Sequence, residues 1–167
     1  MTPDLATLDQ QLAEIAAGVA RALVARRETI VVVESSAGGL ISSALLAQAG
    51  ASAYFLGGAV VYTAASREAL LGITLDDMNG MRSASEPYAQ LLARTAKARL
   101  GASWCLAETG AAGPSGNRYG DAPGHACLAI DGPTTASVQT LETGSADRAA
   151  NMRVFAITAL AMIAEAL

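Results

Sequence analysis

Apolar residues recur along this chain at two different spacings, and the alternation predicts a series of helices and strands. Residues 5–26 carry apolar side chains three or four positions apart, which is the spacing of an amphipathic helix. Residues 29–33 (TIVVV) form a short β-branched run, typical of a strand covered on both faces. A helix over residues 38–49 and a strand over residues 54–63 are predicted to follow.

The rest of the chain continues the alternation and then changes character. Gly57-Gly58, inside the second strand, predicts a bulge or a close approach of the backbone. Residues 109–123 are rich in Gly, Pro and Asn, and a loop of this length is usually functional or mobile. The other predicted elements are helical segments at 66–71, 75–81 and 85–100, strands at 104–108, 124–130 and 136–141, and a closing helix at 146–166.

Strands that alternate with helices, followed by a hairpin, predict an α/β fold. We expect a three-layer α/β/α sandwich with a mixed, mostly parallel sheet. The length fits one domain, so residues 1–167 are predicted to form a single unit. Ligands of such sheets bind at the carboxyl ends of strands. The loops after Val33, Val61 and Ala107 are therefore the candidate site.

Composition limits the function classes. Hydrophobic residues make up 52% of the chain and aromatic residues only 4%, so the core must consist mainly of aliphatic side chains. The formal net charge is -4 and there is no basic run, which argues against nucleic-acid binding. An anionic small ligand would need a local arginine pocket.

The cysteines and the chain ends point to a cytoplasmic protein. Cys105 and Cys127 lie in apolar runs and are expected to be buried free thiols, with a disulfide as the alternative. With the single His125 they do not form a zinc-binding pattern, so no metal is expected. Met1 to Leu5 do not begin a secretory leader, and no apolar run reaches the roughly 18 residues that span a bilayer.

The segment Glu34-Ser35-Ser36-Ala37-Gly38-Gly39 joins the first predicted strand to a helix. It places hydroxyl groups and backbone N–H groups at a helix start, an arrangement that suits a phosphate, a carboxylate or an oxyanion. A tight turn capped by serines explains the same residues equally well. Further polar residues follow the other two strands, among them Tyr62, Thr63, Arg67 and Thr109.

Several motifs in order resemble the CinA C-terminal domain family, whose characterised members are nicotinamide mononucleotide amidases. They cover nearly the whole chain. The motifs are Glu34 to Gly39 (ESSAGG), Phe55 to Ile73 (FLGGAVVYTAASREALLGI), Ala84 to Pro87 (ASEP), Thr109 to Gly116 (TGAAGPSG), Ala122 to Gly124 (APG), and Asp147-Arg148 with Arg153.

The resemblance implies hydrolysis of the amide of nicotinamide mononucleotide by a serine nucleophile, without a metal or cofactor. Carried over, the nucleophile is Ser35 and Tyr62 is an activating partner. Backbone N–H groups near Gly38-Gly39 or Gly110 would hold the oxyanion. Arg148 or Arg153 would hold the phosphate. Ser36, Thr63 and Thr109 are the other expected substrate-binding residues, although Ser36 could instead cap the turn.

The chain departs from the family pattern at three polar positions. Arg67 stands where the family has a lysine, and Ala64 and Ala37 replace an asparagine and a threonine. Arginine stays protonated and cannot accept the proton of Ser35, although it can orient a ligand or stabilise negative charge. The alternative is therefore a divergent protein that binds a nucleotide-like or other anionic ligand, or hydrolyses a different amide.

The roles of some residues remain open at this point. Glu108 could be a buried base, but a salt bridge with Arg67 or Arg118 is the favoured expectation. The segment 117–119 could be a mobile lid or a solvated loop, and His125 is expected to be structural. The apolar first and last helices could bury faces in a partner, so a homo-oligomer is expected.

Overall fold

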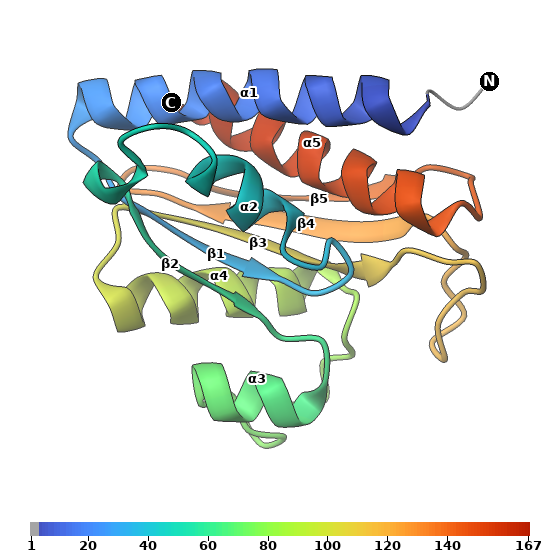
Figure 1. The fold of residues 1–167 in the computed structure, drawn as a ribbon. Coiled ribbons are helices and arrows are strands. Elements are labelled where there is room, and N and C mark those ends of the chain that lie inside the picture. Colours follow the sequence, from blue (N-terminus) through green and yellow to red (C-terminus); the bar gives the residue numbers. More distant parts are fainter. Residues whose placement is uncertain (1–3) are drawn as a thin grey trace.

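The computed structural model describes residues 4–167, so the first three residues of the predicted domain lie outside it. Five strands and five α-helices follow one another in the predicted alternation (Figure 1). The elements are α1 (Leu5–Arg26), β1 (Ile30–Glu34), α2 (Leu40–Leu46), a 3₁₀ turn η1 (Ala51–Ala53), β2 (Phe55–Val60), α3 (Ala64–Leu71), α4 (Glu86–Leu100), β3 (Trp104–Ala111), β4 (His125–Asp131), β5 (Ala136–Glu142) and α5 (Arg148–Ala166).

The strands form one mixed sheet in the order β2-β1-β3-β4-β5. β1 pairs in parallel with both β2 and β3, whereas β4 is antiparallel to β3 and to β5. Four of the five strands therefore run in one direction and only β4 is reversed. The carboxyl ends of β1, β2 and β3 meet at the same edge, where a ligand site is expected.

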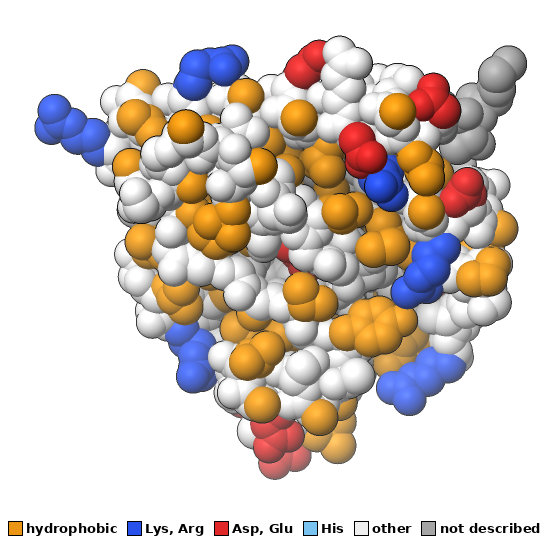
Figure 2. Space-filling view, in the orientation of Figure 1, with side chains coloured by type: hydrophobic (Ala, Val, Ile, Leu, Met, Phe, Trp, Pro, Cys, Tyr) orange, Lys and Arg blue, Asp and Glu red, His pale blue; other side chains and the backbone are white. Residues whose placement is uncertain are grey.

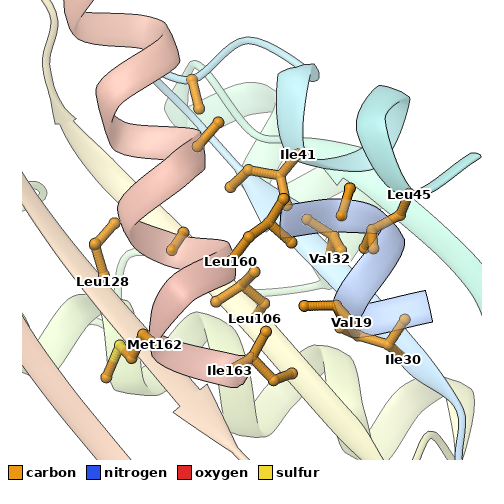
Figure 3. Packing of buried hydrophobic residues seen from close by; sticks show 14 of the residues in the cluster. Val19, Ile30, Val32, Ile41, Leu45, Leu106, Leu128, Leu160, Met162 and Ile163 are labelled. Atoms are coloured by element: carbon orange, nitrogen blue, oxygen red, sulfur yellow. The ribbon is translucent and has the colours of Figure 1, made fainter. Parts of the chain in front are cut away.

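Helices cover both faces of the sheet, which confirms the predicted sandwich. α2 and α5 pack on one face and α4 on the other, while α1 packs chiefly on α5 and α2 (Figure 1). Figure 3 shows how Val32 of β1, Leu106 of β3 and Leu160 of α5 meet in the core between these layers. All five residues of β1 are buried, because helices cover the strand on both sides.

The edge strand β2 contains the irregularity that Gly57-Gly58 predicted. Its register against β1 shifts between Ile30 and Val31, which leaves Leu56 as an extra residue. A Cβ atom added at Gly58 would lie 2.5 Å from Ser42 Oγ on α2. Both the bulge and the close approach are therefore present.

Several boundaries differ from the sequence prediction. α2 ends at Leu46 rather than at residue 49, and β2 ends at Val60 rather than at residue 63. β3 continues past Glu108 to Ala111, because Thr109, Gly110 and Ala111 pair with β4. Tertiary pairing here overrides the low strand propensity of glycine and alanine. Residues 75–81 form hydrogen-bonded turns rather than a helix.

The last helix and the cysteines lie in the interior. α5 is long and apolar enough to cross a membrane by length and composition alone, yet it packs between α1 and the sheet. Its buried residues include Phe155 and Leu160. Cys105 and Cys127 are both buried free thiols, as predicted.

Gly110 offers a test of the strand pairing. A Cβ at this position would lie 2.3 Å from His125 O and 2.9 Å from Ala126 Cα, which are backbone atoms that cannot move aside. We expect Gly110→Ala to lower the free energy of unfolding by about 2–3 kcal/mol in urea titrations. Gly18→Ala, in α1 with only Arg21 Nη2 at 4.0 Å, is the control and should be neutral or slightly stabilising. Equal stability of Gly110→Ala and the parent would contradict the pairing.

Candidate active-site cleft

A cleft of about 460 Å³ opens at the carboxyl ends of β1, β2 and β3. The three segments singled out in the sequence all contribute to it, through Ser35, through Tyr62, and through Thr109 near the end of β3. Its wall is completed by Val61, Thr63, Ala64, Arg67, Leu75, Met78, Met81, Ser83, Tyr88, Asn117, Arg118 and Tyr119. These lining residues include two arginines and three tyrosines but no carboxylate.

The turn that follows β1 is held by a buried carboxylate from β3. The backbone N–H groups of Ser35 and Ala37 donate to Glu108 Oε2, at 2.9 and 2.8 Å. The Ser36 hydroxyl donates to Glu108 Oε1. Glu108 is 0% exposed, so its whole carboxyl group lies beneath the turn.

A second buried carboxylate, that of Glu34, holds the start of α2. Glu34 Oε1 accepts the N–H of Ile41 at 2.8 Å, and Oε2 accepts the N–H and the hydroxyl of Ser42 at 3.0 and 2.7 Å. A negative charge at this end of a helix is favoured by the helix dipole. Glu34 therefore caps α2 from inside the protein.

These contacts leave fewer backbone N–H groups of the turn free for an anion. The N–H groups of Ser35, Ala37, Ile41 and Ser42 already bond to the chain's own carboxylates. A ligand phosphate or oxyanion would have to compete with a buried internal anion for them. The serine-capped turn, in which Ser36 satisfies a buried partner, describes the structure better.

The expectation of a salt bridge between Glu108 and Arg67 or Arg118 is wrong. No cationic nitrogen of the described residues lies within 4 Å of this carboxyl group, because Glu108 lies beneath the turn and both arginines line the cleft. Burial raises the pKa of Glu108, and the nearby Glu34 adds to this, while the three hydrogen bonds from the turn oppose it.

Ser35 is half-buried and lines the cleft, but the hydrogen bonds of the described residues give its hydroxyl no base. Tyr62 lies on the same wall and is 61% exposed. Arg148 Nη1 donates to Gly113 O at 2.6 Å, and its Nη2 donates to the Tyr62 hydroxyl at 3.3 Å. Arg148 thus connects the start of α5 to the rim of the cleft.

Arg67, at the lysine position of the family pattern, is buried in the cleft wall. Its Nε donates to Ile73 O at 3.0 Å, which fixes the orientation of the side chain. A capping box at Thr63 and Ser66 starts α3 and so places Arg67 on the first turn of the helix. Ala64, from the same segment, also lines the cleft.

Six expected site residues do not line the cleft, and one of them is Arg148, which reaches only the hydroxyl of Tyr62 at its rim. Ser36 is turned inward to Glu108, and Gly110 is used for strand pairing. A Cβ at Gly38 would lie 2.8 Å from Met152 Cε of α5, and Gly39 is the N-cap of α2. Arg153 pairs instead with Asp9 of α1, its Nε lying 2.6 Å from Asp9 Oδ1.

Residues 117–119 form one wall of the cleft, and hydrogen bonds to the adjoining Asp121 anchor the segment. Arg82 donates to both oxygens of Asp121, at 2.5 and 3.0 Å, and its guanidinium lies 5.4 Å from the centre of the Tyr119 ring. Asn117 Nδ2 also donates to Asp121 at 2.8 Å. A bidentate arginine contact of this kind is directional and strong.

His125 joins this wall to the sheet. Its Nδ1 lies 2.5 Å from Glu142 Oε1 and its Nε2 lies 2.9 Å from Ala84 O, so both ring nitrogens face acceptors. Burial opposes the charged ring, but the hydrogen bonds to Glu142 and Ala84 and the charge of Asp121 outweigh it and raise the pKa of His125. The Ala84 N–H donates to the hydroxyl of Thr109, which lines the cleft.

Sequence reasoning did not find the apolar part of the cleft. Leu75, Met78, Met81 and Tyr88 line it. Met78 and Tyr88 are also buried, and at sequence level they cannot be distinguished from core residues. Among the residues the structure describes, no group of three or more His, Cys, Asp or Glu side chains is placed to hold a metal ion.

Comparison with known proteins identifies a family. The family model for the CinA C-terminal domain matches residues 12–167. A CinA-like protein of Prochlorococcus marinus (strain MIT 9313) is 37% identical over 81% of this chain and 31% of its own length. Another from Anaeromyxobacter sp. (strain K) is 34% identical over 81% of this chain and 33% of its own. The chain thus spans about a third of the length of these curated relatives.

Solved structures are similar over nearly the whole chain. A competence-damaged protein (CinA) superfamily protein from Klebsiella pneumoniae 700603 is 27% identical with a TM-score of 0.86, covering 92% of this chain and 96% of that one. The competence/damage inducible protein CihA from Agrobacterium tumefaciens is 26% identical with a TM-score of 0.85, covering 98% and 96%.

The buried Glu108 should make stability depend on pH. Its pKa is raised above the ordinary value of 4.5, so its stabilising contribution is complete below that pH and is lost as the pH rises through the folded-state pKa. We expect Glu108→Gln to gain stability relative to the parent from pH 4 to pH 8. The amide oxygen can still accept the N–H groups of Ser35 and Ala37 without carrying a charge, and the amide NH₂ group can donate to the Ser36 hydroxyl in place of the present contact. Urea midpoints of both proteins measure this. Parallel pH curves would refute it, and the exposed Glu68→Gln is the control.

His125 is the single histidine of the chain, so its imidazole titration can be observed without overlap from another histidine. One-dimensional proton NMR of the imidazole should give a titration midpoint above 6.5 in the parent, because both ring nitrogens donate to acceptors. Glu142→Gln should lower that midpoint, whereas the exposed Glu165→Gln should leave it unchanged. The paired interaction contributes stability below pH 6.5 that is lost as the pH rises through the folded-state pKa. A parent midpoint at or below 6.5 would contradict the assigned contacts.

Proposed function

Because the chain belongs to the CinA C-terminal domain family, we propose that it deamidates nicotinamide mononucleotide in the cleft at the carboxyl ends of β1 to β3. The products are nicotinic acid mononucleotide and ammonia, a reaction of pyridine nucleotide salvage. The observation that carries the proposal is the placement of Ser35, Tyr62 and Thr109 around one cleft lined by arginine and tyrosine but no carboxylate. We also propose that the protein is cytoplasmic and forms a homo-oligomer.

The proposed reaction proceeds through the Ser35 hydroxyl. Its oxygen attacks the carboxamide carbon, the C–N bond breaks, and ammonia leaves with the added proton. Water then hydrolyses the acyl ester, which releases the carboxylate and restores the serine. Tyr62 is the candidate proton acceptor, and Arg148 holds its hydroxyl in position.

The cleft itself suits a nucleotide-like ligand. Tyr62 and Tyr119 supply aromatic surface for a planar ring, and Met78 and Met81 supply apolar contacts. Arg118 is exposed at the mouth, with its guanidinium 5.1 Å from the centre of the Tyr119 ring, and can reach a phosphate. Arg153 is not available for this role because it is paired with Asp9.

A second candidate function is the binding of an anionic ligand without turnover, or the hydrolysis of another amide. Arg67 favours it, because a guanidinium cannot accept the proton of Ser35. The internal carboxylate of Glu108 favours it too, since it occupies N–H groups of the turn that could otherwise stabilise an oxyanion.

Ammonia release from nicotinamide mononucleotide by the purified protein tests the proposal. We expect Ser35→Ala to reduce turnover about a thousandfold or more. Arg67→Lys should raise it about tenfold to a hundredfold, because a desolvated lysine can act as a base. Ser43→Ala, on the exposed face of α2, is the matched control and should leave the rate unchanged.

The two candidate functions give different results in this assay. Serine-dependent turnover supports the amidase. Absence of turnover in a folded parent protein that the nucleotide nevertheless stabilises against heat supports the binding function.

A further inference from the structure

Arg67 is the buried member of the two charged side chains that line the cleft. The residue is only 5% exposed, whereas Arg118 lies in the open. A buried charge is costly unless an opposite charge or hydrogen bonds compensate it. The partners of this guanidinium therefore indicate the charge of the ligand that the cleft binds.

The protein itself does not neutralise Arg67. Its Nε donates to Ile73 O, but no carboxylate of residues 4–167 lies within 4 Å of the guanidinium. Hydrogen bonds from Thr74 lower the pKa of Asp77, and the charge of Arg67 lowers it further from a greater distance. Burial raises the pKa of Tyr88, and Arg67 opposes that effect.

We propose that Arg67 anchors an oxyanion subsite in the depth of the cleft. The ligand presents a carboxylate or a phosphate group to the terminal nitrogens of the guanidinium, whose planar fork matches either group. The bond from Nε to Ile73 O holds the fork in place before the ligand arrives, so little side-chain freedom is lost on binding. The inference rests on the proposed function for the location of the ligand, and not on hydrolysis.

The local field of the cleft is consistent with an anion. The chain carries a formal net charge of -4, and on the face shown in Figure 2 the Lys and Arg side chains lie apart from one another. The cleft lining, by contrast, holds Arg67 and Arg118 and no acidic residue. An anionic ligand is thus attracted by this site and not by the molecule as a whole.

Calorimetric titration of the full chain tests the subsite with three probes. Nicotinate and nicotinamide share one ring and differ in charge, and inorganic phosphate lacks the ring. We expect either nicotinate to bind about tenfold or more tightly than nicotinamide, or phosphate to bind while the two rings bind alike. The first result assigns the subsite to a carboxylate and the second to a phosphate.

The variants link the anion to the side chain. Arg67→Met removes the charge and should abolish the preference, and Arg67→Lys keeps a point charge and should retain part of it. Arg94→Met, exposed on α4, should bind as the parent does. If Arg67→Met does not fold, the inference is tested by the anion affinity of Arg67→Lys and by the comparison of nicotinate with nicotinamide in the parent protein.

A parent protein that binds neither anion, or an Arg67→Met variant that keeps the anion preference, overturns the inference. Ammonia release is measured separately. Loss of hydrolysis with intact anion binding would therefore reject only the amidase.

Discussion

Two buried carboxyl groups hold the turn between β1 and α2, and neither has a cationic nitrogen of residues 4–167 within 4 Å. The cleft depends on them. Glu34 and Glu108 come from neighbouring parallel strands, so their side chains reach the same turn from adjacent positions in the sheet. Together they accept four backbone N–H groups and two serine hydroxyls. Ser35 is held in the cleft wall because its backbone N–H donates to the buried Glu108.

The position of charge in the site follows from this arrangement. Two carboxyl groups lie under the turn, where its hydrogen-bond donors reach them, and positive charge lies in the cleft wall on Arg67. The carboxyl groups and this guanidinium are not paired with each other. A protein that keeps both buried is arranged for a ligand that reaches Arg67, while Glu108 stays occupied by the turn.

The sequence was informative where local pattern and tertiary structure agree. The β-branched run at 29–33 and the periodic helix at 5–26 are predicted from spacing, and strand direction brings the three polar loops together. The partners of Glu108 could not be predicted, because they lie more than 70 residues away and are set by β1–β3 pairing. The same holds for Arg153, whose partner Asp9 is on a helix that packs beside α5.

The reversal of β4 separates two ends of the molecule. The connection from β4 to β5 lies at the amino end of β3, opposite the cleft, since Asp131 pairs beside Cys105. Lys97 fixes its base through Asp131 and Gly132 O, while Pro133 to Thr135 are exposed. Exposed loop tips tolerate insertion. A fluorophore attached there would lie away from the cleft. A surface tether attached there would hold the protein with its cleft facing the solution.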